Sequence, residues 1–320
     1  MRFSTFSITM REWEPEQGAR NLKEIGYDGV AWRLVDQQQS DTPGFWIGNR
    51  STWPLTGIEE MIPEIERVRE ATGLEIAAFY GYPRWSDRAA LERHFAVAAK
   101  LGVKACRIVG PGEVVGSSPG PQLGMERFDR LLEDSRRDFK WLADCARDHG
   151  VRAVTPLHHE WVNASASGAR RLLDGLDPAA VGIIIDWGHL VIEGWEDPLA
   201  TVQILGEYLD SVMLKNFGLY PMQTREDGTV VWGYRPETLR KGRVDFYNVF
   251  AALNAVGFDG WVTLAETAGD ELSTWERLAD ALAYVKAADQ ATKGARREDW
   301  SYGYGPLGGQ WAGLPAAAAI

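Results

Sequence analysis

A phrase that recurs along the chain constrains the fold most strongly. LKEIGYDGVAW (22–32) resembles LNAVGFDGWVT (253–263). Three further segments share its outline: REATGLEIAAF (69–79), AKLGVKACRIV (99–109) and RDHGVRAVTPL (147–157). Each consists of a helical pattern, a glycine and a short β-rich run. Glycine ends helices because it adopts the left-handed conformation without a Cβ penalty. The phrase therefore predicts repeated βα units.

Eight strand-like runs are present, with amphipathic stretches such as 58–73 and 125–150 between them. The runs are 2–9, 29–35, 74–81, 103–110, 151–158, 181–188, 211–218 and 261–267. This alternation predicts a single (β/α)₈ TIM barrel over residues 1–290, followed by a C-terminal tail at 291–320. A doubly wound sheet is the alternative, but it usually carries a Gly-rich phosphate loop after its first strand, and the sequence shows none there.

Composition narrows the classes of function. The chain has 320 residues, is 45% hydrophobic and carries a net charge of −11, which argues against nucleic acid or an anionic membrane as partner. No apolar stretch approaches the ~18–20 residues of a membrane span. The N-terminus does not have the pattern of a signal peptide, and Cys106 and Cys145 are expected to be buried free thiols. We therefore expect a cytoplasmic protein.

In a TIM barrel the chemistry lies where strands end and βα loops begin. The groups expected there are Arg33, Tyr80, Arg107, His158, His159, Glu160, Asp186, His189, Lys215, Asn216 and Glu266. Two connections, 36–57 and 219–243, are long and rich in aromatic residues, and Trp232 of the second is a candidate for stacking on a sugar ring. The tail is expected to cross the barrel surface or to dock on a partner subunit.

Two carboxylates end apolar strand runs. Asp186 in IIIDWGHL and Glu266 in WVTLAET are candidates for metal binding or catalysis, because a buried strand end does not tolerate an unpaired carboxylate. Alternatively, Asp186 caps the next turn and Glu266 forms an ion pair. We expect the two carboxylates to form the floor of a site, with a cation between them. That cation would be a metal ion, Lys215 or a protonated histidine.

Lysine and histidine supply the remaining candidates. Lys215 could stabilise an enolate oxygen or bind a sugar hydroxyl, or it could be a solvated lysine at a strand end. If the strand stays extended, His158 and His159 cannot both face inward, so one should line the pocket and the other should pack sideways or begin the loop. Glu160 shares the face of His158.

Several segments together resemble the sugar phosphate isomerase/epimerase family of xylose isomerase-like TIM barrels. They are GYDGVAWRLVD (26–36), CRIVGPG (106–112), residues 158–197 from HHEW to GWED, LGEYLDSVMLKN (205–216) and KGRVDFYNVFAALNAVGFDGWVTLAE (241–266). The resemblance covers roughly residues 1–290 and says little about the identity of the substrate. It implies Mn²⁺ or Mg²⁺ held by Glu, Asp, His and Glu from the last four strands, and proton transfer next to a sugar carbonyl.

The match to that ligand set is partial. Asp186 and Glu266 fall on two of the usual ligands, whereas Pro156 and Met213 stand where the family has glutamate and histidine, and Ala31 replaces a glutamate of the second strand. His158, His159 or Glu160 are candidate replacement ligands, and His189 stands where many relatives carry Asn. The alternative is a site without a metal, with histidine acid/base chemistry or no catalysis. The metal set suggested by the resemblance is therefore Asp186, Glu266, Glu160 and His189.

The resulting expectation is a sugar or keto-sugar isomerase or epimerase. Its catalytic residues would be Glu266, His158, His159 and Lys215, and its substrate-binding residues would be Arg33, Arg107, His189 and Trp232. Two alternatives stay open: a lyase that performs β-elimination on a keto-sugar or keto-glycoside, and a non-catalytic sugar-binding or structural subunit. The partners would be a small-molecule sugar and either a second copy of the chain or a small subunit.

Overall fold

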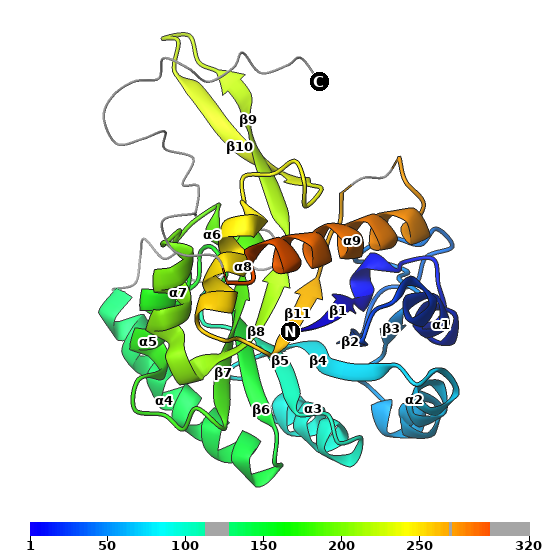
Figure 1. The fold of residues 1–320 in the computed structure, drawn as a ribbon. Coiled ribbons are helices and arrows are strands. Elements are labelled where there is room, and N and C mark those ends of the chain that lie inside the picture. Colours follow the sequence, from blue (N-terminus) through cyan, green and yellow to red (C-terminus); the bar gives the residue numbers. More distant parts are fainter. Residues whose placement is uncertain (113–127, 269–270, 295–320) are drawn as a thin grey trace.

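A computed structural model describes residues 1–112, 128–268 and 271–294 of the chain. Within these residues, eight parallel strands form a closed barrel with the helices outside it (Figure 1). The strand order is β1, β11, β8, β7, β6, β5, β4, β2, and β2 pairs again with β1. The predicted (β/α)₈ barrel is therefore confirmed, and the doubly wound sheet is excluded.

The strands are mostly shorter at their carboxyl ends than the apolar runs suggested. They are β1 (Arg2–Phe6), β2 (Gly29–Leu34), β4 (Glu75–Arg84), β5 (Ala105–Val109), β6 (Arg152–Pro156), β7 (Val181–Asp186), β8 (Leu209–Leu214) and β11 (Trp261–Leu264). Residues Ser7–Thr9 form a 3₁₀ helix, η1, instead of extending β1. Residues Trp187–Leu190 form a short helix, α6, directly after β7. The histidines at 158, 159 and 189 and Lys215 therefore lie beyond the ends of the barrel strands. Arg33, Arg107 and Asp186 lie within β2, β5 and β7.

The outer layer follows the predicted amphipathic pattern. Its helices are α1 (Pro15–Ile25), α2 (Ile58–Thr72), α3 (Arg88–Lys100), α4 (Phe128–Asp148), α5 (Ala166–Leu173), α7 (Pro198–Leu205), α8 (Phe246–Ala255) and α9 (Thr274–Thr292), with a second 3₁₀ turn, η2, at Gly206–Tyr208. The glycines of the recurring phrase all have positive φ: Gly26, Gly73, Gly102, Gly150 and Gly257.

Both cysteines are buried and free. Among the described helices, none is long and apolar enough to cross a membrane.

Alternation along each strand divides the core into two parts. Every second side chain of a strand points the same way, and we call such positions positions of one parity. Those of one parity fill the barrel interior: Phe6, Ile8, Ala31, Ala78, Tyr80, Ala105, Val154, Ile184, Met213 and Ala265. The other parity packs against the helices, as Ile183 and Ile185 do on either side of Ile184. Because side chains two residues apart share a face, parity also determines which strand-end groups reach the barrel mouth.

The two long connections differ from each other. Residues 36–57 contain only a two-residue strand, β3 (Thr52–Trp53), which pairs with β2. The predicted loop at 219–243 is wrong: β9 (Asn216–Thr224) and β10 (Val230–Glu237) form an antiparallel hairpin that projects from the barrel (Figure 1). The sequence prediction missed it because the exposed hairpin lacks a buried apolar run. The expected tail lies outside the described residues, apart from the end of α9.

Candidate functional site

Asp186 and Lys215 meet at the barrel mouth. Asp186 has the parity of Ile184 and Lys215 that of Met213, so both side chains point to the interior side. Lys215 Nζ donates to Asp186 Oδ2 over 2.7 Å, and Asp186 is only 1% exposed. Asp186 Oδ1 also accepts from the backbone N–H of His189 at 3.3 Å, so the carboxylate caps α6. The cation beside Asp186 in this structure is therefore Lys215.

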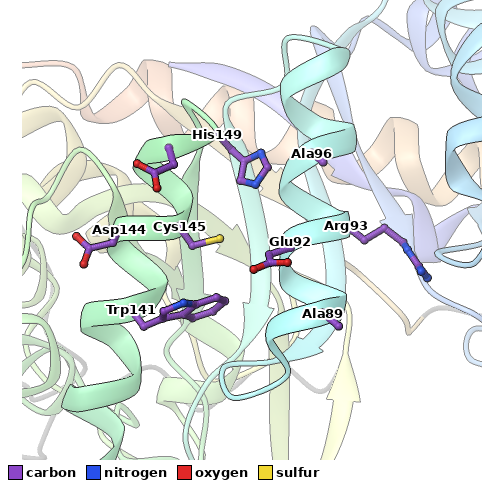
Figure 2. Close-up of a pocket in the computed structure, with 9 residues that line it drawn as sticks. Ala89, Glu92, Arg93, Ala96, Trp141, Asp144, Cys145 and His149 are labelled. Atoms are coloured by element: carbon purple, nitrogen blue, oxygen red, sulfur yellow. The ribbon is translucent and has the colours of Figure 1, made fainter.

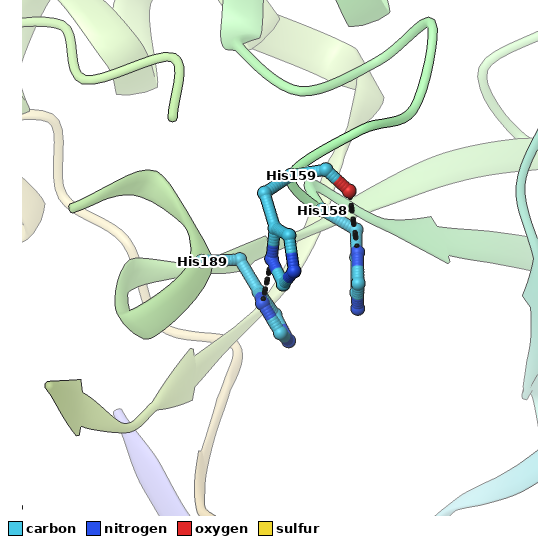
Figure 3. Close-up of side chains that lie close together, drawn as sticks. All are labelled: His158, His159 and His189. Carbon is cyan, nitrogen blue, oxygen red and sulfur yellow. Dashed lines mark hydrogen bonds between the residues drawn. The ribbon is translucent and has the colours of Figure 1, made fainter. Parts of the chain in front are cut away.

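Three histidines lie close together (Figure 3), and one of them, His189, contacts both Lys215 and Asp186. The rings of His158 and His159 stack with centroids 4.4 Å apart, and the rings of His158 and His189 lie 3.7 Å apart. His159 Nδ1 is 2.8 Å from His189 Nδ1, and His189 Nε2 is 3.2 Å from Lys215 Nζ. Because β6 ends at Pro156 and His159 begins a turn, both imidazoles reach His189, and the expectation that one histidine would begin the loop agrees with the position of His159.

The hydrogen-bond partners determine which nitrogen carries the proton in each ring. The Lys215 ammonium only donates, so His189 Nε2 accepts and His189 Nδ1 carries the proton that is donated to His159 Nδ1. His159 is therefore protonated on Nε2. His158 Nδ1 lies 2.8 Å from the carbonyl oxygen of His159 and must donate to it. The lone pair of His158 consequently lies on Nε2.

All three imidazoles are held in the neutral form. Burial, which is the largest cause, and the charges of Lys215 and Arg107 together lower the pKa of His158 to about 3. The pKa of His189 lies well below its ordinary value for the same reasons, and burial also lowers the pKa of His159. The cluster therefore offers neutral nitrogen donors and acceptors at neutral pH.

Two buried arginines line the other side of the mouth. Arg33 and Arg107 share the interior parity of Ala31 and Ala105, and their guanidinium carbons lie 5.7 and 4.6 Å from the ring centroid of Tyr82. Arg107 Nη1 donates to the carbonyl oxygen of Gly81 over 2.7 Å. Tyr82 was not among the sequence candidates because β4 was expected to end at Gly81. It has the parity of Tyr80, which would have identified it in a longer strand.

Glu266 lies in a different layer from Asp186, and the expected shared floor is wrong. Ala265 occupies the interior position, so Glu266 faces the helices with Leu264. Its carboxylate accepts from the backbone N–H of Leu239 at 2.6 Å. Burial raises the pKa of Glu266 from 4.5 to about 7, and the charges that act on it come from residues outside the mouth: Arg277, Asp280 and Arg240.

Two further candidates lie at the edge of the site or beyond it. Glu160 has φ 65°, and its backbone N–H donates to Glu193 Oε2 over 2.7 Å, while its charge acts on the neighbouring His159. Trp232 lies on the projecting hairpin with 54% of its surface exposed. The described residues therefore bring together Arg33, Arg107, His158, His159, Asp186, His189 and Lys215.

The donor groups at the mouth do not fit Mn²⁺ or Mg²⁺ as they are arranged. Those ions prefer oxygen ligands, and Asp186 is already paired with the Lys215 ammonium. The three histidines offer nitrogens within 4.8 Å of one another. However, an ion about 2 Å from an imidazole nitrogen lies in the plane of that ring, and these rings overlap at interplanar angles of 22°, 32° and 36°, so their planes do not converge on one such point. The rings would have to rotate to form a metal site.

A cavity of about 680 Å³ lies elsewhere, between the outer helices α3 and α4 (Figure 2). Its lining includes Glu92, Trp141, Cys145 and His149. The pKa of Cys145 is raised to about 11, mainly by burial, so the thiol is not an activated nucleophile. The chemistry-bearing cluster is therefore at the barrel mouth and not in this cavity.

Comparisons with known proteins agree with the architecture. The model of the family described as "Xylose isomerase-like TIM barrel" matches residues 19–291. An inosose dehydratase from Lacticaseibacillus casei is 27% identical over 260 residues, which cover 76% of this chain and 84% of that protein.

Two solved structures share the fold. The 3-keto-D-glucoside 4-epimerase of E. coli has a TM-score of 0.65 and 17% identity, and the match covers 90% of this chain and 99% of that one. The IOLI protein with a bound zinc atom has a TM-score of 0.67 and 14% identity, with 91% and 99% covered.

Proposed function

We propose that this chain, which belongs to the xylose isomerase-like TIM barrel family, is an enzyme that removes a proton from the carbon next to the carbonyl group of a sugar or keto-sugar. Its similarity to an inosose dehydratase and to a 3-keto-D-glucoside 4-epimerase supports this class of reaction. Isomerisation, epimerisation and dehydration of such compounds can all begin with this step.

The observation that carries the proposal is the lone pair of His158 Nε2 at the barrel mouth. His158 Nδ1 donates to the His159 carbonyl, so Nε2 is the nitrogen that can accept a proton. In the proposed step, Nε2 takes the proton of the α-carbon, the C–H electron pair becomes the C=C bond of an enolate, and the carbonyl oxygen takes the negative charge. Burial and nearby cations lower the pKa of His158 to about 3, so the imidazolium formed in this step depends on the negative charge of the enolate for its stability.

Two fates of the enolate follow from the same site. Return of a proton to carbon or oxygen gives an isomer or an epimer, and the Nε2–H of His159 is a donor for that step. Alternatively, the enolate expels a β-hydroxyl group, which leaves as water after protonation. The second fate makes the enzyme a lyase, and the similarity to an inosose dehydratase over most of the chain favours it.

Deuterium uptake tests the reaction. The protein is incubated in D₂O with free sugars, inososes and 3-keto-glycosides, and NMR follows exchange of the α-hydrogen. We expect exchange with at least one keto compound, together with either an epimer or an unsaturated product that absorbs in the ultraviolet. Absence of exchange with every compound would contradict the proposal and favour a sugar-binding or structural subunit.

Two matched variants test the assignment of the base. His158→Asn should slow exchange by about 100-fold or more, the usual contribution of a general base. Glu266→Gln should retain exchange near the wild-type rate, because this carboxyl faces the helices. Melting curves show whether both variants are folded. The reverse pattern of activities would identify Glu266 as the base and reject His158.

A further inference from the structure

The barrel mouth is positively charged, although the chain as a whole is acidic. Arg33, Arg107 and Lys215 point to the interior side, and Asp186 is the one carboxylate that shares their parity at the strand ends of the described part of the chain. The histidines beside them are neutral. Three cationic side chains thus lie near one buried carboxylate, and the charges of Glu160 and Glu193 act on His159 at the edge of the cluster.

The cations are close enough to act together. Arg33 and Arg107 lie on the same ring, that of Tyr82. The charges of Arg107 and Lys215 both reach His158 and His189, so these two residues flank the histidine cluster. Lys215 keeps 23% of its side chain exposed, and its ammonium contacts Asp186 and His189. The cationic groups of the mouth thus lie around the Tyr82 ring and the histidine cluster.

In the part of the chain that the structure describes, some N–H groups of these cations have no acceptor. Within the described residues, Arg107 donates to the Gly81 carbonyl through Nη1, and no acceptor contacts its other nitrogens. Arg33 is 4% exposed, and its buried Nε has no partner, whereas its Nη atoms donate to the 36–57 segment. A buried guanidinium with unpaired N–H groups favours a planar or tetrahedral anion as partner.

We propose that the barrel mouth binds an anionic group of the substrate, a carboxylate or a phosphate, through Arg107 and Lys215, with Arg33 adding positive charge. This assignment rests on the proposed function, because it specifies the class of sugar that the enzyme transforms. The same cations stabilise the oxygen that becomes negative in the enolate. They would repel a divalent metal ion placed there for the same purpose.

Calorimetric titration measures binding without requiring turnover. The probes are D-glucuronate, D-glucose 6-phosphate and uncharged D-glucose, at low and at high NaCl. We expect one of the charged sugars to bind more tightly than glucose. Its affinity should decrease at high NaCl, since screening reduces charge attraction. Binding of glucuronate alone identifies sugar acids as the substrate class, and binding of glucose 6-phosphate alone identifies sugar phosphates. MnCl₂ and MgCl₂ should not bind at the mouth.

Variants locate the site. Arg107→Gln and Lys215→Met should each weaken binding of the charged sugar by about 10- to 100-fold, as expected for one charge-assisted hydrogen bond. Arg225→Gln, on the exposed hairpin, is the matched control and should bind like the wild type. Two independent positions keep the test valid if one variant does not fold, and melting curves report this.

Three results would overturn the inference: equal affinity for charged and uncharged sugars, unchanged affinity in both folded variants, or stoichiometric Mn²⁺ binding that Asp186→Asn abolishes. The reaction itself is judged by the deuterium experiment alone. Binding of an anionic sugar without any exchange would retain the anion site and reject the proposed chemistry. Exchange with an uncharged sugar that binds as tightly as the anions would retain the chemistry and reject the anion site.

Discussion

Glu266 illustrates how one position along a strand changes the environment of a carboxyl group. Its neighbour Ala265 takes the interior position, and the Glu266 carboxyl is buried beneath the helical layer with the Leu239 N–H as its hydrogen-bond donor. Burial raises its pKa from 4.5 to about 7, so the folded state favours the protonated form. A residue in this position affects stability more directly than chemistry at the mouth.

Glu266→Gln should change the pH dependence of stability. Between pH 4.5 and 7 the carboxyl of the unfolded wild type loses its proton while the folded one keeps it, so the free energy of unfolding falls as pH rises. Glutamine does not titrate. Relative to the wild type, the free energy of unfolding of the variant should increase by about 1–3 kcal/mol when the pH is raised from 4.5 to 8. Urea denaturation of both proteins at the two pH values measures this, and parallel pH profiles would contradict it.

The hairpin β9–β10 is an element that the barrel does not need for its core. Apolar side chains such as Met222 and Trp232 are 57% and 54% exposed on it. Leu219 and Tyr234 face each other across the two strands, so a two-residue turn can replace everything between them.

Replacing Tyr220–Gly233 by Asn-Gly should change the free energy of unfolding by less than about 1 kcal/mol, since little buried surface is lost. Denaturant melts of the shortened and complete proteins check this. A loss of several kcal/mol would show that the hairpin supports the barrel. The KM of the shortened enzyme tests whether Trp232 binds substrate, because only that role predicts a higher KM.

The whole molecule is closed by contacts between the two ends of the described chain. Tyr27 Oη donates to the Leu278 carbonyl at 3.0 Å, Arg277 Nη2 to the Thr9 carbonyl at 2.8 Å, and Lys286 Nζ to the Gly26 carbonyl at 2.9 Å. The helix α9 thereby covers the seam where β1 meets β11 (Figure 1). The barrel depends on this last helix.

A protein that ends at Gly294 should therefore fold with the circular dichroism spectrum and cooperative melting of the complete chain. A protein that ends at Leu272 lacks α9, exposes the apolar residues beneath it, and should not melt cooperatively. If the first protein fails to fold, the proposed boundary between the barrel and the tail at about residue 290 is wrong.

The sequence by itself determined the architecture. Glycine at helix ends and short apolar runs are local signals, and the recurring phrase repeats them often enough to specify eight βα units. The sequence also placed Asp186, Lys215 and the histidines near strand ends, because the ends of apolar runs mark the ends of strands. The hairpin was missed, since an exposed ribbon does not bury a continuous apolar face.

The tertiary structure alone decided which of these groups share a site. The last residue of a strand and the turn after it set the parity of each side chain, and a change of one residue moves a group to the other side of the sheet. For that reason Glu266 faces the helices, while His158 and His159 both reach His189 after β6 ends at Pro156. The positive mouth likewise arises from residues far apart in sequence, because barrel closure brings Arg33, Arg107 and Lys215 to one face.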